Sequence, residues 1–191
     1  MNLRDYYFLL IHGYNGSSKS DWFPAISRLF QSHNVQYRIP DMPKGLFSKY
    51  PDGKSWIRII ENEICNTKLP IILVGYSLGA RSLLEYIETH ELYFPLLLLV
   101  ASPKNDPNLK FYRFGTAMSF FRHRLDTDKI RSKVSKIIVL SSRDDRIVPY
   151  LWGQDLAEEL KATFLLYEDK GHMNMPSFAE EVIHIIKNNL A

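Results

Sequence analysis

The chain has 191 residues, of which 46% are hydrophobic and 24% are charged. These values are typical of a globular protein with one sizeable core, and they exclude a disordered or fibrous chain. Lysine and arginine total 24 against 21 acidic residues, so the net charge of +3 is too small to indicate nucleic-acid binding. We therefore expect one domain over residues 1–191 and no nucleic-acid partner.

The single cysteine, Cys65, excludes an internal disulfide and a thiol pair for a metal or redox site. It follows Ile57, Ile60 and Ile64 at helical spacing, which predicts a half-buried position on the core side of a helix. The longest apolar run, residues 96–101, is far too short to span a bilayer, and no basic, apolar leader is recognisable. We expect a cytoplasmic protein without a membrane span.

Short apolar runs of strand length alternate with longer segments of helical period. The strand candidates are residues 6–11, 35–39, 71–76, 96–101, 137–140 and 163–167. All but the second are apolar on both faces, as buried parallel strands are. The alternation predicts an α/β fold, a three-layer αβα sandwich around a mostly parallel sheet of about six strands.

Helical patterns fill the intervals between the predicted strands. Three apolar stripes are formed by Trp22, Ala25, Ile26, Leu29 and Phe30, by Leu83, Leu84 and Ile87, and by Leu151, Leu156 and Leu160. A last helix is predicted to begin at Ser177, whose hydroxyl can cap the first turn while Glu180 reaches back in a capping box. The connection over residues 102–135 is longer than a crossover needs, which is typical of a lid or a binding wall. We expect any lid to be small or absent.

The strongest motif is Gly75-Tyr76-Ser77-Leu78-Gly79, a G-x-S-x-G sequence between a predicted strand and a predicted helix. A serine on such a turn has a strained backbone and an exposed hydroxyl at the carboxyl end of the sheet. The flanking glycines remove side chains where strand and helix nearly collide. The bare pattern also occurs in ordinary loops, but its setting between strand and helix favours Ser77 as a nucleophile.

A serine hydroxyl needs a general base and an acid that orients it, and in this kind of site the order along the chain is serine, acid, histidine. His172 follows the last predicted strand, at the sheet edge where ligand sites gather, and is the predicted base. His12 precedes the serine and has the wrong order. The other four histidines, His33, His90, His123 and His184, are better explained as surface or packing residues. His123 also remains open as a substrate contact.

Two aspartates compete as the acid in the loop after residues 137–140. Asp145 precedes Ile147-Val148-Pro149 in a D-x-x-V-P pattern, whose proline can fix the loop so that one carboxylate points inward. We predict Asp145 as the acid, and Asp144 as a solvated or turn-forming neighbour.

The oxyanion that forms when a serine attacks a carbonyl needs backbone donors. The NH of Leu78, directly after the nucleophile, is one candidate. The NH of Tyr14 is the second, because Gly13 and Tyr14 follow the first predicted strand. His12-Gly13 can also be a plain tight turn, and the two interpretations are compatible.

These residues resemble the serine hydrolase family that includes retinoblastoma-binding protein 9 and its bacterial relatives. The resemblance extends over nearly the whole chain, through the Gly13 loop with Trp22, Asp41-Met42-Pro43, the Gly75 to Gly79 elbow, Asp145-x-x-Val148-Pro149 and Gly171-His172. It implies an α/β-hydrolase domain over residues 1–191 with Ser77, Asp145 and His172 as the triad. The namesake's Leu-x-Cys-x-Glu stretch, linked to retinoblastoma protein, corresponds here to residues 63–67, which read Glu-Ile-Cys-Asn-Thr, so that partner is not expected.

We expect hydrolysis of small carboxylic esters or amides through an acyl-enzyme on Ser77, with no metal or cofactor. A thioesterase or a carbon-carbon hydrolase could use the same triad, and a binding protein on a hydrolase scaffold is the rival class. Aromatic residues of the segment 111–121, in particular Phe120 and Phe121, and also Trp22 are candidate substrate contacts. Core packing explains those rings equally well.

Overall fold

The computed structural model describes residues 2–43, 52–65, 67–106 and 117–190. Its strands are β1 (Tyr7–Ile11), β2 (Gln36–Arg38), β3 (Ile71–Tyr76), β4 (Phe94–Val100), β5 (Val134–Ser142) and β6 (Thr163–Tyr167). Its helices are α1 (Phe23–Ser32), α2 (Gly53–Ile64), α3 (Leu78–Thr89), α4 (Thr127–Ser132), α5 (Tyr150–Leu160) and α6 (Phe178–Asn189), with short 3-10 turns η1 (Leu3–Asp5) and η2 (Ala117–Phe120).

The six strands form one parallel sheet in the order β2-β1-β3-β4-β5-β6. Every predicted strand is confirmed, and β3 and β6 have the predicted bounds. The strand β6 is only half-buried, although its sequence is as apolar as that of a central strand. Its position at the edge of the sheet explains the difference, because a neighbouring strand covers it on one side only.

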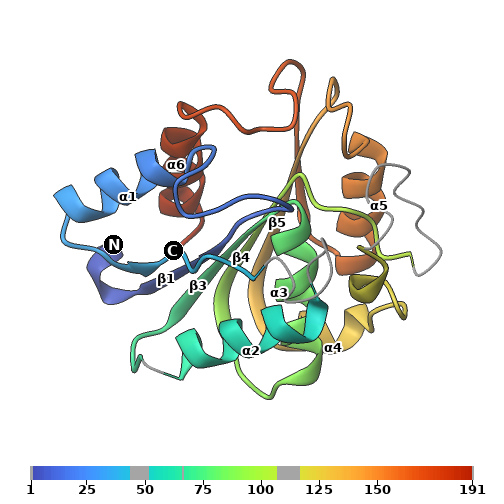
Figure 1. Ribbon diagram of the computed structural model, residues 1–191, viewed down its shortest axis with the longest axis horizontal. Helices are drawn as coiled ribbons and strands as arrows, with labels where there is room; N and C mark the ends of the chain where they lie inside the picture. The colour runs from blue at the N-terminus through green and yellow to red at the C-terminus, as the bar shows by residue number, and fades with distance from the viewer. Residues whose placement is uncertain (1, 44–51, 66, 107–116, 191) are drawn as a thin grey trace.

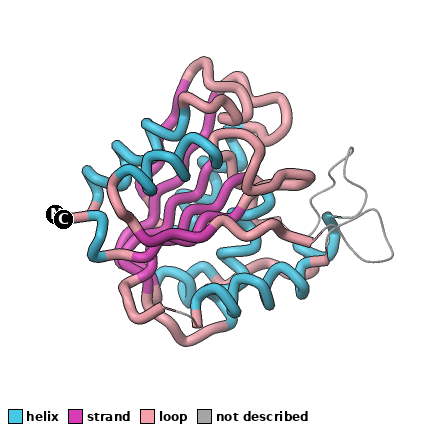
Figure 2. Tube along the Cα trace, turned by 60° about the vertical axis from the view of Figure 1, so that its left-hand side comes forward, coloured by secondary structure: helices cyan, strands magenta, loops and turns pink. Residues whose placement is uncertain are grey.

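Helices cover both faces of the sheet, which confirms the three-layer αβα sandwich (Figure 1, Figure 2). Along β1, Phe8 and Leu10 belong to the core under α1 and α6, whereas Leu9 and Ile11 belong to the core under α2, α3, α4 and α5. Because successive strand residues point to opposite faces, a strand between two helical layers must be apolar throughout.

The strand order creates a crevice at the carboxyl ends of β1 and β3. From β1 the chain continues through α1 to β2 on one side, whereas from β3 it continues through α3 to β4 on the other. Loops that leave adjacent parallel strands in opposite directions leave room for a ligand between them. The register pairs Ile11 with Gly75, so the segment after β1 and the residue Ser77 begin side by side.

Three local predictions are wrong. Ser177 is the N-cap of α6, but its hydroxyl makes no capping bond because its backbone is already helical, at φ −63° and ψ −20°. Leu151 is 51% exposed, because five residues separate it from Leu156 and rotate it by about 140° away from the buried stripe. Cys65 is exposed because it caps α2 after Ile64, where the chain leaves the core.

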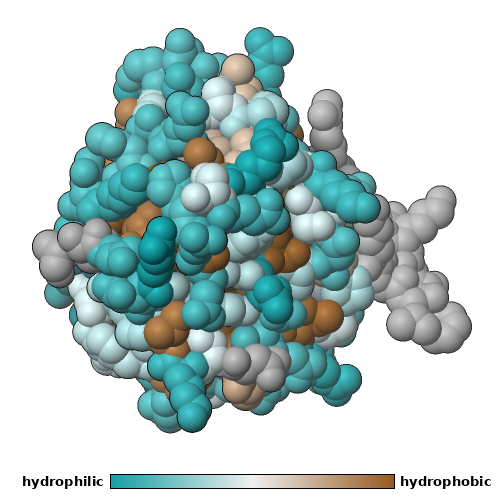
Figure 3. Space-filling model, turned by 90° about the vertical axis from the view of Figure 1, so that its left-hand side faces the viewer, coloured by the Kyte–Doolittle hydropathy of each residue, from teal (hydrophilic) through white to brown (hydrophobic). Residues whose placement is uncertain are grey.

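None of the helices built by the described residues is both long and apolar enough to cross a membrane. Figure 3 shows one face of the molecule, on which hydrophilic side chains predominate and apolar side chains form separate small spots.

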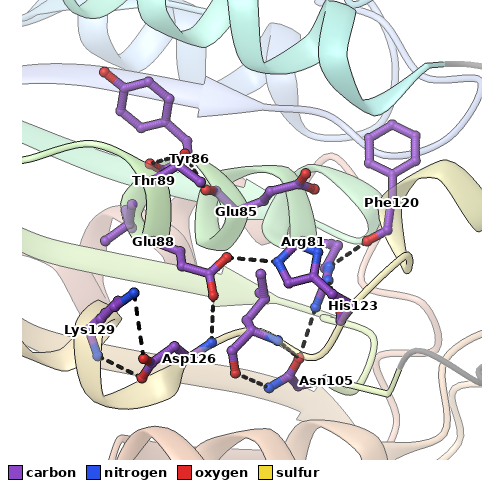
Figure 4. Close-up of polar contacts among 12 residues, drawn as sticks. Arg81, Glu85, Tyr86, Glu88, Thr89, Asn105, Phe120, His123, Asp126 and Lys129 are labelled. Atoms are coloured by element: carbon purple, nitrogen blue, oxygen red, sulfur yellow. Dashed lines mark hydrogen bonds and ion pairs between the residues drawn. The ribbon is translucent and has the colours of Figure 1, made fainter.

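Arg81 on α3 carries its charge into the interior and is only 1% exposed (Figure 4). Its guanidinium donates from Nε to the Phe120 carbonyl (2.7 Å), from Nη1 to Asn105 Oδ1 (3.0 Å) and from Nη2 to the His123 carbonyl (2.9 Å). It also lies 5.2 Å from the centre of the Phe121 ring. Burial lowers the pKa of Arg81 to about 10. These contacts bind the long connection after β4 to the helix that follows Ser77.

Asn105 joins the two ends of that connection. Its Oδ1 accepts from Leu125 N at 2.8 Å, and its Nδ2 donates to the Leu125 carbonyl at 3.0 Å. Through Arg81 and Asn105, the described residues at both ends of this connection are therefore attached to α3 and to each other. The aromatic residues Phe111, Tyr112 and Phe114 lie outside the described residues.

We expect Arg81→Lys to lower the free energy of unfolding by about 2–4 kcal/mol, because a lysine cannot make three divergent hydrogen bonds and leaves buried acceptors unpaired. Urea unfolding measures the change. Arg28→Lys, at an exposed position on α1, is the matched control and should stay within about 0.5 kcal/mol of the wild type. An Arg81→Lys protein that unfolds with the wild-type midpoint would contradict the anchoring role.

Candidate active site

Ser77 lies on a sharp turn between β3 and α3. Its backbone angles are φ 53° and ψ −119°, a left-handed conformation that costs a residue with a side chain about 1–3 kcal/mol. Two hydrogen bonds hold the turn, from Ser77 N to the Val100 carbonyl (2.8 Å) and from Ala80 N to the Ser77 carbonyl (3.0 Å). The backbone strain is that of a nucleophile elbow.

Glycines make the elbow sterically possible. A Cβ at Gly75 would lie 2.5 Å from Ala80 Cα, so strand and helix nearly collide there. A Cβ at Gly79 would lie 2.2 Å from the carbonyl oxygen of Ile11. The second glycine of the motif therefore admits the neighbouring strand β1, a reason that the local sequence pattern did not reveal.

His172 and Asp145 meet at the carboxyl ends of β5 and β6. His172 Nδ1 lies 2.8 Å from Asp145 Oδ2, and the side chains are 12% and 1% exposed. An ionised carboxylate can only accept, so Nδ1 carries the proton and Nε2 of a neutral ring has a free lone pair. The structure brings the predicted base and acid together in the arrangement that orients an imidazole.

The second oxygen of Asp145 fixes its orientation. Oδ1 accepts from the backbone NH groups of Ile147 (2.8 Å) and Val148 (3.0 Å). The residues after the aspartate thus wrap around its carboxylate, a role of their backbone that the D-x-x-V-P pattern did not indicate.

Asp144 supports the segment that carries His172. Its Oδ1 accepts from the Ser142 hydroxyl (2.6 Å) and from Gly171 N (2.8 Å), and the Ser142 hydroxyl accepts from Lys170 N (2.8 Å). The hydrogen bond from Ser142, followed by that from Gly171, lowers the pKa of Asp144. Asp144 is exposed, as predicted for a turn-forming neighbour, but it also joins the loops after β5 and β6.

Tyr76, the second residue of the motif, contacts His172 in two ways. Its hydroxyl donates to the His172 carbonyl at 2.9 Å, and the two rings have centres 5.2 Å apart. Burial raises the pKa of Tyr76, so the phenol stays protonated and remains a donor. No local sequence pattern indicates this role, because His172 lies 96 residues after Tyr76 along the chain.

A cavity of about 300 Å³ opens in the crevice between β1 and β3. It is lined by Gly13, Tyr14, Asn15, Asp21, Tyr76, Ser77, Leu78, Pro103, Ile147, His172 and Asn174. Ser77 and His172 thus face the same space, and Asp145 lies buried behind His172. Within the ranges that the structure describes, no three or more His, Cys, Asp or Glu side chains cluster as a metal site would require.

The two predicted oxyanion donors also line this cavity. Leu78 is the first residue of α3, where backbone NH groups have no acceptor within the helix. Tyr14 follows Gly13, whose added Cβ would lie only 3.0 Å from Ser77 Cβ. Buried His12 holds this loop, because its Nε2 accepts from Met42 N (2.9 Å) while its Nδ1 donates to the Gly13 carbonyl (2.8 Å).

The three aromatic residues considered as substrate contacts lie elsewhere. Trp22, Phe120 and Phe121 are 0%, 1% and 3% exposed, and the described lining of the cavity includes none of them. Trp22 packs on other rings under α1 and α6, and the two phenylalanines belong to the core on the α3 side. His123 pairs with Glu88 at 2.9 Å on the surface.

Sequence comparison identifies the family. A family model described as serine hydrolase matches residues 8–183. The chain belongs to this serine hydrolase family. YdeN of Bacillus subtilis (strain 168) is 29% identical over 166 residues, which cover 85% of this chain and 83% of YdeN. The serine hydrolase RBBP9 of Rattus norvegicus is 31% identical over 136 residues, covering 71% of this chain and 69% of RBBP9.

Solved structures show the same fold for this serine hydrolase. The crystal structure of the B. subtilis ydeN gene product superposes with a TM-score of 0.80 at 23% identity, covering 95% of this chain and 98% of that one. Alpha/beta hydrolase domain-containing protein 10 from mouse gives 0.69 at 14% identity, covering 95% and 88%. The chain therefore has the α/β-hydrolase fold, as the resemblance implied.

We expect Asp144→Asn to make the stability of this serine hydrolase less sensitive to acid. Because the folded state lowers the pKa of Asp144, the carboxylate stabilises the fold above the unfolded pKa near 3.9, and this contribution is lost as the pH falls through the lower folded pKa. Urea unfolding at a series of pH values below about 4.5 measures the slope.

The exposed residue Asp169, in the adjoining loop after β6, provides the control, since Asp169→Asn removes an equal charge. It should keep the wild-type slope. Parallel curves for Asp144→Asn and the wild type would argue against the bridging role of Asp144.

Proposed function

We propose that this serine hydrolase cleaves small carboxylic esters or amides through an acyl-enzyme on Ser77. The observation that carries the proposal is the 2.8 Å contact of His172 Nδ1 with Asp145 Oδ2, combined with Ser77 and His172 on the wall of one cavity. A base that is oriented by a buried carboxylate and opens into the same space as a strained serine suits acyl transfer.

In the proposed acylation step, Ser77 Oγ attacks the substrate carbonyl carbon and His172 Nε2 takes the hydroxyl proton. Asp145 stabilises the resulting imidazolium through the Nδ1 hydrogen bond. The NH groups of Leu78 and Tyr14 donate to the oxyanion of the tetrahedral intermediate. The intermediate then collapses, and His172 returns the proton to the departing alcohol or amine.

In the proposed deacylation step, His172 takes a proton from water as the water oxygen attacks the acyl carbon. The tetrahedral intermediate breaks the bond to Ser77 Oγ, which recovers its proton from His172. Only protein groups and water take part in either step. A cavity of about 300 Å³ lies at the small end of ligand sites, which favours a short substrate.

We expect a fluorophosphonate probe to label Ser77 and Ser77→Ala to abolish the labelling, because the probe captures an activated serine. Mass spectrometry of the labelled protein identifies the modified residue. Labelling of Ser77→Ala at the wild-type rate would rule out Ser77 as the nucleophile, and a wild type that is never labelled would favour a binding protein on a hydrolase scaffold.

For Asp145→Asn we expect kcat on a short p-nitrophenyl ester to fall about 10⁴-fold, because an asparagine no longer selects the Nδ1-protonated imidazole. Asp169→Asn, in the loop that carries His172, should retain wild-type kcat. A small loss in Asp145→Asn would exclude Asp145 as the acid. Parallel assays on ester, thioester and amide substrates of one acyl group distinguish the reaction classes.

A further inference from the structure

The described part of the cavity wall carries one formal negative charge. Among the described lining residues, Asp21 alone has a formal charge at neutral pH when His172 is neutral, and the lining includes no lysine or arginine. Asp145 lies behind His172 and is paired with it. A bound substrate would therefore meet the carboxylate of Asp21, with no lysine or arginine among the described residues of the wall.

In the part of the chain that the structure describes, neither a helix cap nor an ion pair accounts for this carboxylate. Asp21 precedes α1, but the N-cap of that helix is Trp22, which makes no side-chain capping bond. The Asp21 side chain accepts a hydrogen bond at Oδ2 from the hydroxyl of Ser20, at 3.1 Å. No ion pair joins it to any of the residues that the structure describes.

The backbone holds Asp21 in a costly conformation. Its φ of 53° is left-handed, which an L residue with a side chain rarely adopts. The preceding turn is closed by hydrogen bonds from Ser20 N to the Ser17 carbonyl (3.2 Å) and from Ser17 N to Ser20 Oγ (2.9 Å). The backbone that carries the carboxylate is thus fixed beside the cavity before any substrate arrives, and the hydrogen bond from Ser20 orients Oδ2, which reduces the entropy lost on binding.

The charge lies on the side of the cavity formed by Tyr76. Burial is the largest cause of the raised pKa of the Tyr76 phenol, and the nearby carboxylate of Asp21 is the second largest. Tyr76 in turn contacts His172, so the charge of Asp21 acts close to the reacting groups. A carboxylate there repels an anionic substrate and attracts a cation, more strongly than in water because the cavity is partly desolvated.

We propose that Asp21 is a specificity residue that selects esters or amides bearing a positively charged ammonium group near the scissile carbonyl. This inference rests on the proposed function, since it concerns the substrate of the same site. The cationic group can belong to the acyl part or to the leaving group, and the chemistry that Asp21 recognises is the same in both.

The test uses two fluorophosphonates that differ only at the end of one alkyl arm, which is trimethylammonium in one and tert-butyl in the other. The two ends have nearly the same shape, so the ratio of their second-order rate constants for inactivation reports charge alone. We expect the wild type to react roughly tenfold faster with the cationic probe. The ratio should fall as salt concentration rises, because salt screens the attraction.

Asp21→Asn should reduce this ratio to about one. Asparagine has nearly the same shape and tolerates a left-handed backbone, so the variant is expected to fold. Asp169→Asn is the control for a general change in net charge, since it removes one exposed carboxylate that does not line the cavity, and it should keep the wild-type ratio.

The outcomes separate the two proposals. If Ser77 reacts with both probes at equal rates, or if Asp21→Asn keeps the wild-type ratio, the selectivity role of Asp21 is wrong while Ser77 remains the nucleophile. If Ser77 reacts with neither probe, the proposed function itself fails. Where the cationic probe is preferred, hydrolysis rates of two matched pairs of esters show which part of the substrate carries the charge. Faster hydrolysis of acetylcholine than of 3,3-dimethylbutyl acetate assigns the charge to the leaving group. Faster hydrolysis of p-nitrophenyl 4-(trimethylammonio)butanoate than of p-nitrophenyl 5,5-dimethylhexanoate assigns it to the acyl part.

Discussion

The close approach of β1 to the first turn of α3 sets the geometry of the whole site. The backbone of Gly79 lies so near the Ile11 carbonyl that even one methyl group would collide with it. Because this contact is possible, α3 can begin directly beside the end of β1. The amino end of α3 then lies next to the Gly13 loop, and Tyr14 and Leu78, from two separate elements, line the same cavity.

The other half of the site is held by hydrogen bonds rather than by tight backbone packing. Asp145 and His172 come from loops at the far side of the sheet, where Ser142 and Asp144 connect them. Tyr76 joins the two halves, since it belongs to β3 but donates to the backbone of His172. The serine side is thus fixed by sterics and the histidine side by polar contacts, with one tyrosine between them.

Local sequence patterns predicted the strands and the sharp turn at Ser77, because these depend on short-range spacing. The edge at which parallel strands end led us to expect Asp145 near His172, and the two side chains are in contact. Such patterns could not separate core rings from cavity rings, so Trp22, Phe120 and Phe121 were ambiguous. The hydrogen-bond partners of Arg81 lie 24 to 42 residues away along the chain, and a periodic pattern does not indicate them. The position of Asp21 depends on a left-handed backbone angle, which such a pattern does not indicate either. The capping hydrogen bond predicted for Ser177 is absent for a similar reason, since the capping-box pattern does not specify the backbone angles of its first residue.

The anchor at Arg81 has a consequence for how this protein can diverge. Two of its three acceptors, at Phe120 and His123, are main-chain carbonyls, which every amino acid possesses. The side chain of the exposed residue His123 can therefore change while its backbone remains attached to α3, whereas Phe120 is also held by its ring, which is buried in the core. The exposed surface of this segment can therefore change without loss of the hydrogen bond that attaches its backbone to α3, and without a change in the turn at Ser77.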